Sequence, residues 1–308
     1  MIQTHHLTRN FKKVRAVDGL TFAIQTGELF GLVGPDGAGK TTTLRLLAGL
    51  LDVSEGNADM LGFDLKEKSE SIKPHVGYMA QQFSLYSELS VMENLQFFSE
   101  LFDVKAQELA ERAERLLNFA GLIEFTNRRA GNLSGGMQKK LALACTLIHE
   151  PEILLLDEPT TGVDPISRRE FWNILTDLHL QGTTILVSTP YMDEADRCSR
   201  VGLMYAGKLV ECDSPKAIRD KLEGEIIEIR PQRPEDWQKI LSVVTSLNGV
   251  SEAQTYGESV HLLVDSGERR MTQVRHALEA ENIPYRSIRI APARMEEAFI
   301  SLMRKMEA

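Results

Sequence analysis

The chain has 308 residues and 43% of them are apolar, so it can bury a full hydrophobic core, and one large domain with a small second one is predicted. It carries 35 Lys and Arg against 44 Asp and Glu, a net charge of −9 without a basic stripe, which argues against nucleic acid as a partner. Its three cysteines are widely spaced and form no C-x-x-C pair, so no disulfide framework or structural zinc site is expected and a reducing cytosol is the natural compartment.

Residues 2 to 33 are predicted to form short strands joined by turns. Apolar segments cover Leu20–Ile24 and Leu29–Val33, with turn residues at Asp18-Gly19 and Thr26-Gly27. Phe11 lies ahead of them in a polar setting, where its ring could stack on a purine or pack at a sheet edge. The N-terminus lacks the apolar core of a signal peptide, and no run approaches the roughly 20 apolar residues of a spanning helix, so any membrane role is expected to come through a partner.

A glycine-rich loop of the form G-x-x-x-x-G-K-[ST] follows, made of Gly34, Pro35, Asp36, Gly37, Ala38, Gly39, Lys40, Thr41 and Thr42. It lies between the apolar strand and a helix-like run, which is the context of a phosphate-binding loop. Backbone N–H groups of such a loop close around phosphate oxygens, Lys40 reaches the terminal phosphates, and the Thr41 hydroxyl can ligate Mg²⁺. The loop therefore predicts a nucleoside-triphosphate site; a chance match in a glycine-containing loop is the alternative.

The next segment is predicted to alternate turns and strands before a helical insert begins. Ser54–Gly62 is read as a turn, a strand and a turn, and His75–Ala80 as a buried strand that ends at Gln81. From Ser90 to about Glu150 the apolar residues recur at three- and four-residue spacing, which indicates amphipathic helices. The aromatic residues of the insert are interpreted as core, or as a surface groove that receives a partner helix and has three residues at its edge, Phe83, Leu85 and Tyr86.

Within this insert a second loop precedes a helix predicted over Lys139–Ile148. Ser134, Gly135 and Gly136 place free backbone N–H groups at the start of that helix. Because a helix N-terminus attracts anions, this is predicted to be a second phosphate-ready site.

The run Ile153–Asp157 is apolar until it ends in Asp157 and Glu158, as expected of a central parallel strand with its chemistry at the carboxyl end. A helix over Pro165–Leu180 and a strand over Thr184–Thr189 follow, so a parallel α/β sheet is predicted. Two buried carboxylates are costly without a cation, and we therefore expect Asp157 and Glu158 to face Mg²⁺ and a reacting water. A purely structural role for both is the alternative.

Around Glu223-Gly224 the predicted pattern of helices and strands changes. Residues 224–308 are predicted as strand, helix, two strands, helix, strand and a last helix, a β-α-β-β-α-β order that suggests a small ferredoxin-like α+β domain after a first domain of residues 1–223. No catalytic constellation is visible there, and His261 and His276 are interpreted as ordinary surface or core histidines.

Taken together, these motifs resemble those of the nucleotide-binding subunits of ATP-binding-cassette (ABC) transporters, over roughly residues 2–220. The resemblance implies a P-loop NTPase with a parallel central sheet, an antiparallel β-subdomain and a helical insert at about residues 84–150. Gly34 to Thr42 is similar to the phosphate-binding loop of the family. Gln81 is similar to the glutamine that links Mg²⁺ and the attacking water to the membrane-facing groove.

The resemblance also implies roles for residues outside that loop. Asp157 is similar to the metal-linked aspartate, Glu158 to the catalytic base, and Phe11 to the aromatic residue that stacks on adenine. Leu133–Met137, which contains Ser134, Gly135 and Gly136, resembles the signature sequence that closes over the ATP of the opposite subunit. Thr161–Asp164 resembles the loop that signals across the dimer.

For function, the resemblance implies ATP hydrolysis with ATP and Mg²⁺, a second cassette in a head-to-tail dimer, and transmembrane permease subunits as partners at the cytoplasmic face of the cell membrane. The Ser-Gly-Gly-Met and Pro-Ile-Ser-Arg-Arg variants and a C-terminal Glu-Glu-Ala-Phe-Ile are similar to the branch that exports drugs, lipids or polymers. A regulatory or structural cassette that binds ATP without turnover is one alternative. A soluble cassette of translation or DNA repair is another, although such proteins carry tandem cassettes.

Two positions depart from the family pattern. Pro190 follows the strand Thr184–Thr189 where the family has a histidine, and proline offers neither an imidazole nor an N–H to the γ-phosphate. Asp36 stands where the family usually has asparagine, and its carboxylate would repel a triphosphate unless it points away or meets a donor. We therefore expect slow hydrolysis at this chain's own site and a histidine-containing cassette as its partner.

Overall fold

The computed structural model describes residues 1–82 and 85–307 and divides into two compact units, residues 1–215 and residues 216–308. We call them the N-terminal domain and the C-terminal domain. The division falls between Pro215 and Lys216, ahead of the predicted boundary at residues 223 and 224. Helix α8 (Pro215–Asp220) begins at the last residue before that division and precedes the first strand of the C-terminal domain.

The N-terminal domain is organised around a sheet with the strand order β10-β9-β3-β8-β7-β6. Its members are β3 (Leu29–Val33), β6 (Val76–Met79), β7 (Ile153–Asp157), β8 (Thr184–Thr189), β9 (Arg200–Tyr205) and β10 (Lys208–Asp213). All pairs are parallel except β9 with β10, so the prediction of a wholly parallel sheet is wrong at this edge. The reason is local: Ala206 and Gly207, with φ of 46° and 81°, form a two-residue turn that can only join antiparallel strands.

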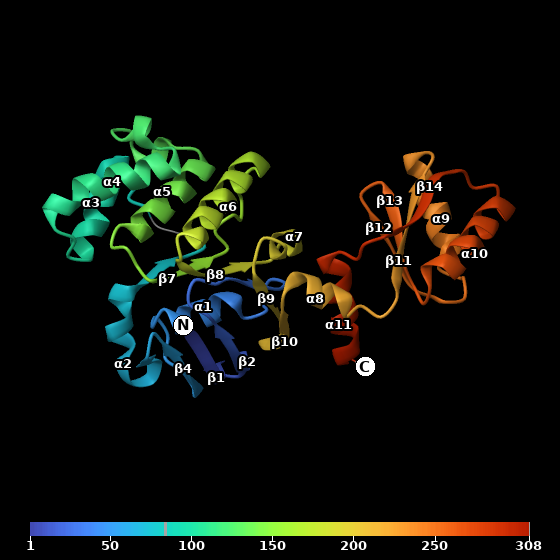
Figure 1. Ribbon diagram of the computed structural model, residues 1–308, viewed down its shortest axis with the longest axis horizontal. Helices are drawn as coiled ribbons and strands as arrows, with labels where there is room; N and C mark the ends of the chain where they lie inside the picture. The colour runs from blue at the N-terminus through green and yellow to red at the C-terminus, as the bar shows by residue number, and fades with distance from the viewer. Residues whose placement is uncertain (83–84, 308) are drawn as a thin grey trace. The chain divides into compact units, whose positions relative to one another are not determined.

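Strands β3, β7 and β8 are buried along their whole length because helices cover both faces of the sheet. Figure 1 places α1 (Lys40–Leu47) and α6 (Pro165–Leu180) on either side of β7 and β8. This explains why the strands read as unbroken apolar runs rather than as alternating ones. Short helix α7 (Met192–Ala195) follows β8.

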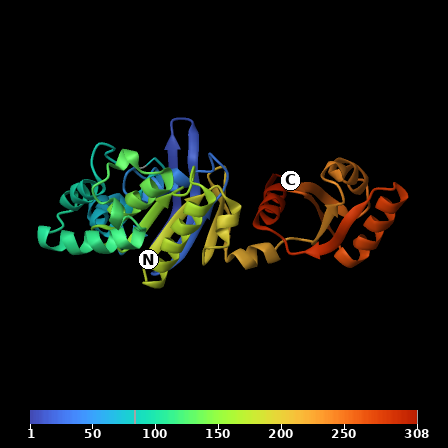
Figure 2. The same cartoon turned by 90° about the horizontal axis from the view of Figure 1, so that it is seen from above.

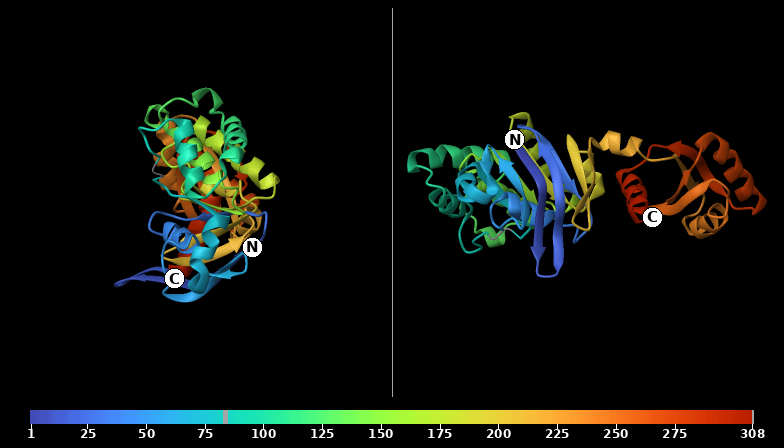
Figure 3. Two further views of the ribbon diagram at one scale, coloured as in Figure 1. Left: turned by 90° about the vertical axis from the view of Figure 1, so that its left-hand side faces the viewer. Right: turned by 90° about the horizontal axis from the view of Figure 1, so that it is seen from below.

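A second sheet, of antiparallel strands, has the order β2-β1-β4-β5. It contains β1 (Ile2–Phe11), β2 (Val14–Ile24), β4 (Glu55–Met60) and β5 (Phe63–Asp64), and its β1–β2 hairpin projects from the domain in Figures 2 and 3. The turn predicted at Asp18-Gly19 is wrong, since β2 runs through both residues. The register of β1 against β2 shifts on either side of Leu7, which pairs with Leu20, and Gly19 with a φ of 66° accommodates the irregularity.

The helical insert consists of α3 (Val91–Leu101), α4 (Ala106–Ala120) and α5 (Gly135–Leu147), which Figure 1 shows grouped together. Ser90 and Glu93 form a capping box at the start of α3, and Gly121 ends α4 with a φ of 67°. Helix α5 begins earlier than predicted because the Ser134 hydroxyl accepts a hydrogen bond from the Met137 N–H and caps it there. Phe83 of the predicted groove edge lies outside the described residues.

The remaining short elements connect these parts. They are α2 (Leu65–Ile72) and the 3₁₀ turns η1 (Lys73–His75), η2 (Ile123–Phe125), η3 (Ala130–Asn132) and η4 (Pro234–Asp236). Over residues 1–82 and 85–307 no helix is long and apolar enough to cross a membrane.

The C-terminal domain holds one antiparallel sheet with the order β12-β13-β11-β14. Its elements are β11 (Glu225–Pro231), α9 (Trp237–Val244), β12 (Val250–Tyr256), β13 (Ser259–Val264), α10 (Gly267–Ala280), β14 (Tyr285–Ala291) and α11 (Met295–Glu307). Ile227 and Ile229 join the apolar core with residues of α9 and α10. Glu228 between them faces the opposite side, and Figure 2 shows α11 on that side of the sheet.

Candidate functional site

The loop between β3 and α1 is held against neighbouring strands and leaves the start of α1 uncovered. The Gly34 N–H donates to the Thr189 carbonyl at 3.3 Å, and a Cβ on Gly34 would lie 2.2 Å from the Met204 carbonyl oxygen, so only glycine fits. Gly39, with a φ of 103°, precedes α1, whose start has no side-chain cap and whose first turn has no acidic residue. The first N–H groups of α1 are therefore available to an anion.

The predicted loop residues differ in exposure. Asp36 and Gly37 at the tip are exposed, Pro35 and Thr42 are half-buried, and Ala38 is buried. The carboxylate of Asp36 thus lies at the surface of the loop. This placement allows it to point away from a bound phosphate.

Lys40 is the buried cation of this site, with only 3% of its side chain exposed. Its Nζ donates to the carbonyl oxygens of Gly34 at 2.9 Å and Pro35 at 3.0 Å, and lies 3.2 Å from Glu158 Oε1. The loop thus orients the ammonium group by two backbone carbonyls and one carboxylate. A phosphate would find this cation already in place.

Asp157, at the end of β7, has one carboxylate oxygen that accepts hydrogen bonds and one that accepts none from the described residues. Its Oδ1 accepts hydrogen bonds from Thr41 Oγ1 at 3.0 Å and Ser188 Oγ at 2.7 Å. Its buried Oδ2 has no hydrogen-bond partner among the described residues. A carboxylate oxygen and a threonine hydroxyl are ligands that Mg²⁺ prefers, so the donor set fits this cation. No group of three or more His, Cys, Asp or Glu gathers within the described chain, so phosphate or water oxygens would have to complete the coordination.

Glu158 follows in a left-handed conformation, with a φ of 45°. A non-glycine residue at positive φ is uncommon, and this backbone turns the Glu158 carboxylate out of the sheet toward Lys40 and Gln81. Gln81 Nε2 donates to Glu158 Oε2 at 2.8 Å, and the Glu158 N–H donates to the Ser188 carbonyl at 3.1 Å. The structure therefore brings Lys40, Thr41, Gln81, Asp157 and Glu158 into one connected cluster.

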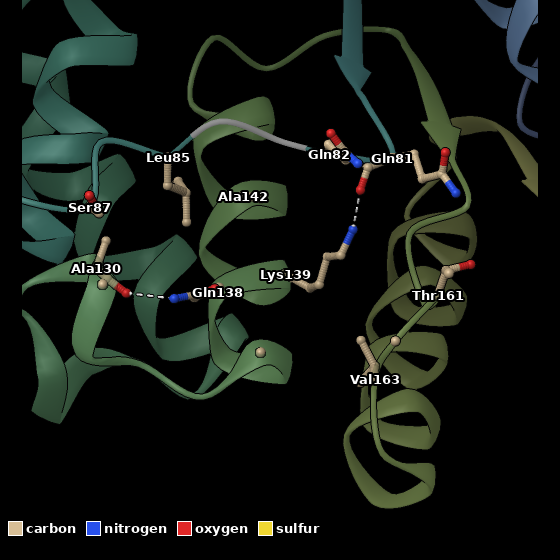
Figure 4. Close-up of a pocket in the computed structure, with 13 residues that line it drawn as sticks. Gln81, Gln82, Leu85, Ser87, Ala130, Gln138, Lys139, Ala142, Thr161 and Val163 are labelled. Atoms are coloured by element: carbon tan, nitrogen blue, oxygen red, sulfur yellow. Dashed lines mark hydrogen bonds between the residues drawn. The ribbon is translucent and has the colours of Figure 1, made fainter.

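A pocket of about 280 Å³ adjoins Gln81 and separates it from the helical insert, as Figure 4 shows. Lys139 of α5 crosses this space, and its Nζ donates to the Gln81 carbonyl at 2.6 Å. Burial lowers the pKa of Lys139, and the charges of Asp157 and Glu158 partly oppose that shift. Sequence reasoning missed Lys139, because a lysine in an amphipathic helix reads as a solvated residue.

A buried carboxylate, Glu194 of α7, ties the two loops beside the cluster together. It is 1% exposed and accepts hydrogen bonds from Thr160 Oγ1 at 2.8 Å, Arg168 Nε at 2.6 Å and Trp172 Nε1 at 2.8 Å. The Thr189 hydroxyl is a fourth donor to it. This network joins the loop after Glu158 to α6 and to the end of β8, and nothing in the sequence pattern pointed to it.

Pro190 directly follows Thr189, whose carbonyl accepts from Gly34, so position 190 stands beside the phosphate-binding loop. Its half-buried ring carries no hydrogen-bonding group.

Two predicted parts of the site make none of these contacts. Ser134 and Gly135 are exposed, and Gly136 is packed against Ser167 of α6, where a Cβ would lie 2.5 Å from the Ser167 Cβ. Phe11 is 41% exposed at the end of β1, with the Arg9 guanidinium 4.8 Å from its ring centre.

Comparison with known proteins identifies the class to which this fold and site belong. The sequence matches the family model described as ABC transporter over residues 17–161. The probable multidrug ABC transporter ATP-binding protein YbhF of Escherichia coli (strain K12) is 43% identical over 94% of this chain, which spans 49% of YbhF, about half its length. The Nod factor export ATP-binding protein I of Neorhizobium galegae is 32% identical over 99% of this chain and 86% of that protein. The chain belongs to the family of ABC transporter ATP-binding proteins.

The fold of the N-terminal domain is likewise that of solved cassettes. The dimeric ATP-binding cassette MJ0796, in a post-hydrolysis state bound to ADP and Pi, superposes with a TM-score of 0.64 and 26% identity. The match covers 70% of this chain and 98% of that one. The predicted P-loop α/β cassette with an antiparallel subdomain is thereby confirmed, with a central sheet that is mixed rather than parallel.

Proposed function

We propose that this chain is the ATP-binding subunit of an exporter and hydrolyses ATP to drive transport through separate permease subunits at the inner face of the cell membrane. The observation that carries the proposal is the buried contact of Glu158 with Lys40 and Gln81 beside an uncapped helix start. The similarity to a Nod factor export ATP-binding protein supports the direction of transport.

In this mechanism the chain's own residues position ATP and a water molecule. The N–H groups at the start of α1 and the ammonium of Lys40 would bind the phosphates, and Phe11 would stack on adenine. Glu158 would accept the proton of the attacking water, with Gln81 holding its carboxylate in place. Thr41, Asp157 and Gln81 are the residues that would hold Mg²⁺, which when bound stabilises the charge that develops on the phosphate oxygens.

Pro190 leads us to propose that this chain's own site turns over slowly. Position 190 adjoins the phosphate-binding loop, and loss of one preorganised polar stabiliser costs on the order of 10²–10³ in rate. The paired cassette would then carry the histidine, while this chain lends the exposed Ser134–Gly136 segment to the partner's site. A regulatory cassette that binds ATP without turnover is the second candidate, and the same proline favours it.

The first experiment measures phosphate release by the purified chain and by Pro190→His, with Pro190→Ala as the matched control. The histidine variant should be faster than both others, because it alone restores a polar side chain. Equal rates for the histidine and alanine variants would show that loop geometry is limiting. Hydrolysis by the unmodified chain alone at the rate of ordinary cassettes would contradict a slow site. Repeating the assay with co-expressed membrane subunits separates the exporter from the regulatory candidate.

The permease subunits are proposed to dock on an apolar groove of about 480 Å³ between the turn after α1, β6 and the end of α3. Leu50 and Leu101 line it and are 53% and 62% exposed. Tyr86 of the predicted edge is exposed as well but is not among its lining residues. Leu101→Asp should prevent co-purification with the membrane subunits and leave ATP binding intact. The matched control is Leu180→Asp, which alters a leucine that is 77% exposed at the end of α6.

For the C-terminal domain we propose a ferredoxin-like accessory domain that stabilises the cassette dimer or regulates it. The strand order β12-β13-β11-β14 with its intervening helices supports this assignment. Deletion of residues 225–308 should weaken assembly or transport. An unchanged complex with unchanged transport would remove the proposed role.

A further inference from the structure

A polar pocket of about 380 Å³ lies wholly within the C-terminal domain. It is bounded by the end of β11, the turn between β12 and β13, the start of β14 and the residues before α11. Three arginines line it, Arg230, Arg286 and Arg294, together with two glutamates, Glu228 and Glu258. The motifs that define the N-terminal site contribute nothing to it.

Glu228 is already neutralised by arginines. Its side chain is 5% exposed and accepts hydrogen bonds from Arg230 Nε and Arg289 Nη2, both at 2.7 Å. Burial alone would raise the pKa of Glu228, but the hydrogen bonds from Arg289 and Arg230 outweigh it and leave the pKa lowered. This carboxylate is therefore ionised, and its charge is balanced by Arg230 and Arg289.

The other two arginines of the pocket, Arg286 and Arg294, have no carboxylate partner among the described residues. Arg286 is exposed and makes no hydrogen bond or ion pair with any residue in the described part of the chain. The Arg294 guanidinium lies 4.1 Å from the centre of the Tyr256 ring, and no described carboxylate is within ion-pair distance of it. Glu258, the remaining acid of the pocket, is exposed and forms no ion pair with described residues. Two guanidinium groups thus share one concave surface, and neither forms an ion pair with a described residue.

Tyr256 supplies an aromatic ring that is held in place beside these arginines. Its ring stacks on that of His261 at 5.3 Å, and His261 is held in turn by Glu297 Oε1, 2.6 Å from its Nδ1. Burial, followed by the nearby Glu296, raises the pKa of Tyr256 to about 12, so its hydroxyl remains protonated. The hydroxyl is engaged by the side chains of Glu296 and Arg294, so Tyr256 offers its ring to a ligand.

We propose that this pocket binds a small organic anion whose carboxylate or phosphate group is held by Arg286 and Arg294. Guanidinium groups bind such planar or multidentate oxyanions through paired charge-assisted hydrogen bonds. The Tyr256 ring, Pro231 and Pro234 supply apolar wall for the rest of the ligand. The volume lies within the range of small-molecule sites, about 300–1,000 Å³.

The test is calorimetric titration of the full chain with two probes, inorganic phosphate and succinate. Mg-ADP is present at saturation so that the phosphate-binding loop of the N-terminal domain is occupied. Arg286→Ala and Arg294→Ala should each weaken binding at least about tenfold, the effect expected from loss of a charge-assisted hydrogen bond. Both side chains are exposed, so the variants should fold. The matched control is Arg275→Ala, which removes an exposed arginine of α10 outside the pocket and should leave binding unchanged.

A second arm separates a soluble anion from a lipid headgroup, using vesicles of phosphatidylglycerol and of phosphatidylcholine. Binding of succinate or phosphate that depends on Arg286 and Arg294 supports the proposal. Binding to phosphatidylglycerol vesicles alone would overturn it in favour of a membrane contact. It would also be overturned if neither probe bound, or if Arg275→Ala weakened binding as much as the pocket variants. None of these results depends on whether the chain hydrolyses ATP.

Discussion

The two domains hold their charged groups in different ways. In the N-terminal domain Gln81 and Glu158 stand in loops that follow β6 and β7, and Lys40 begins α1 after the loop that follows β3, where the backbone is free to turn a side chain outward. In the C-terminal domain Glu228 and Arg289 stand in the middle of adjacent strands and meet because β11 pairs with β14 in that register.

The two arrangements differ in how readily they form a ligand-binding site. Loops at the carboxyl ends of parallel strands converge on one edge, so a few short segments can surround a ligand. A charged cluster on the face of an antiparallel sheet is spread over the strands and is set by register, so it becomes a site only where the sheet ends and leaves donors unpaired. The pocket at Arg286 and Arg294 is such an end.

The strongest test of the N-terminal arrangement is Glu158→Gln. Loss of a general base should lower ATP hydrolysis by about 10²–10⁴, because the amide cannot accept a proton from water. ATP binding should persist, since Lys40 and the start of α1 are unchanged. Phosphate release and nucleotide affinity of the assembled complex are the measurements. Glu152→Gln, which alters an exposed glutamate that pairs with His75, should leave both unchanged.

Thr189→Val tests whether the Glu194 network holds the loops of the N-terminal site. The valine leaves a buried carboxylate oxygen without its donor, which should cost about 1–3 kcal/mol of the free energy of unfolding. Urea denaturation followed by tryptophan fluorescence measures it. The matched control is Thr176→Val, whose hydroxyl donates to the Trp172 carbonyl within α6. Equal losses for the two variants would show that the network adds nothing beyond a local hydrogen bond.

Phe11→Ala tests the part of the N-terminal site that shares no contact with the catalytic cluster. Loss of stacking on adenine should weaken ATP binding about tenfold and leave the rate at saturating ATP unchanged. Nucleotide titration and steady-state hydrolysis measure the two effects. Val14→Ala, which removes another exposed apolar side chain of the same hairpin, is the control. A fall in the saturated rate without weaker binding would contradict the stacking role.

The smallest expected effect concerns Glu228 and its pH dependence. Because its pKa is lowered in the folded chain, its contribution to stability is present above its unfolded pKa and is lost as the pH falls through the folded pKa. Arg230 and Arg289 are 53% and 59% exposed, so solvent screening limits the contribution to about 1 kcal/mol or less.

Glu228→Gln should therefore reduce stability at about pH 6, and this effect should shrink as the pH falls through the folded pKa of Glu228. Denaturant unfolding of the C-terminal domain over a series of decreasing pH values measures this. Glu258→Gln removes an exposed carboxyl of the same pocket and serves as the control. A difference between wild type and Glu228→Gln that persists at low pH would show that packing, rather than charge, is responsible.

Much of the N-terminal site could be predicted because most of its functional residues lie in short contiguous segments of the sequence. The strand over Leu29–Val33, the glycine loop and the following helix are local patterns, and so is an apolar strand that ends in Asp157 and Glu158. The edge strand β10 and the course of β2 past Gly19 were not predicted correctly. Both depend on positive φ angles at Gly207 and Gly19, which a turn and a bulge use equally well.

The sequence by itself determined the nucleotide-binding loop, the two carboxylates and the order of elements in the C-terminal domain, because each depends on neighbours within one strand, loop or helix. Only the tertiary structure decided which side chains meet at long range. Lys139 reaches the carbonyl of Gln81 58 residues away, and Arg289 reaches Glu228 across 61 residues. A single charged residue reads the same at the surface and in a buried network, so its partner is known only once sheet register and helix packing have placed both.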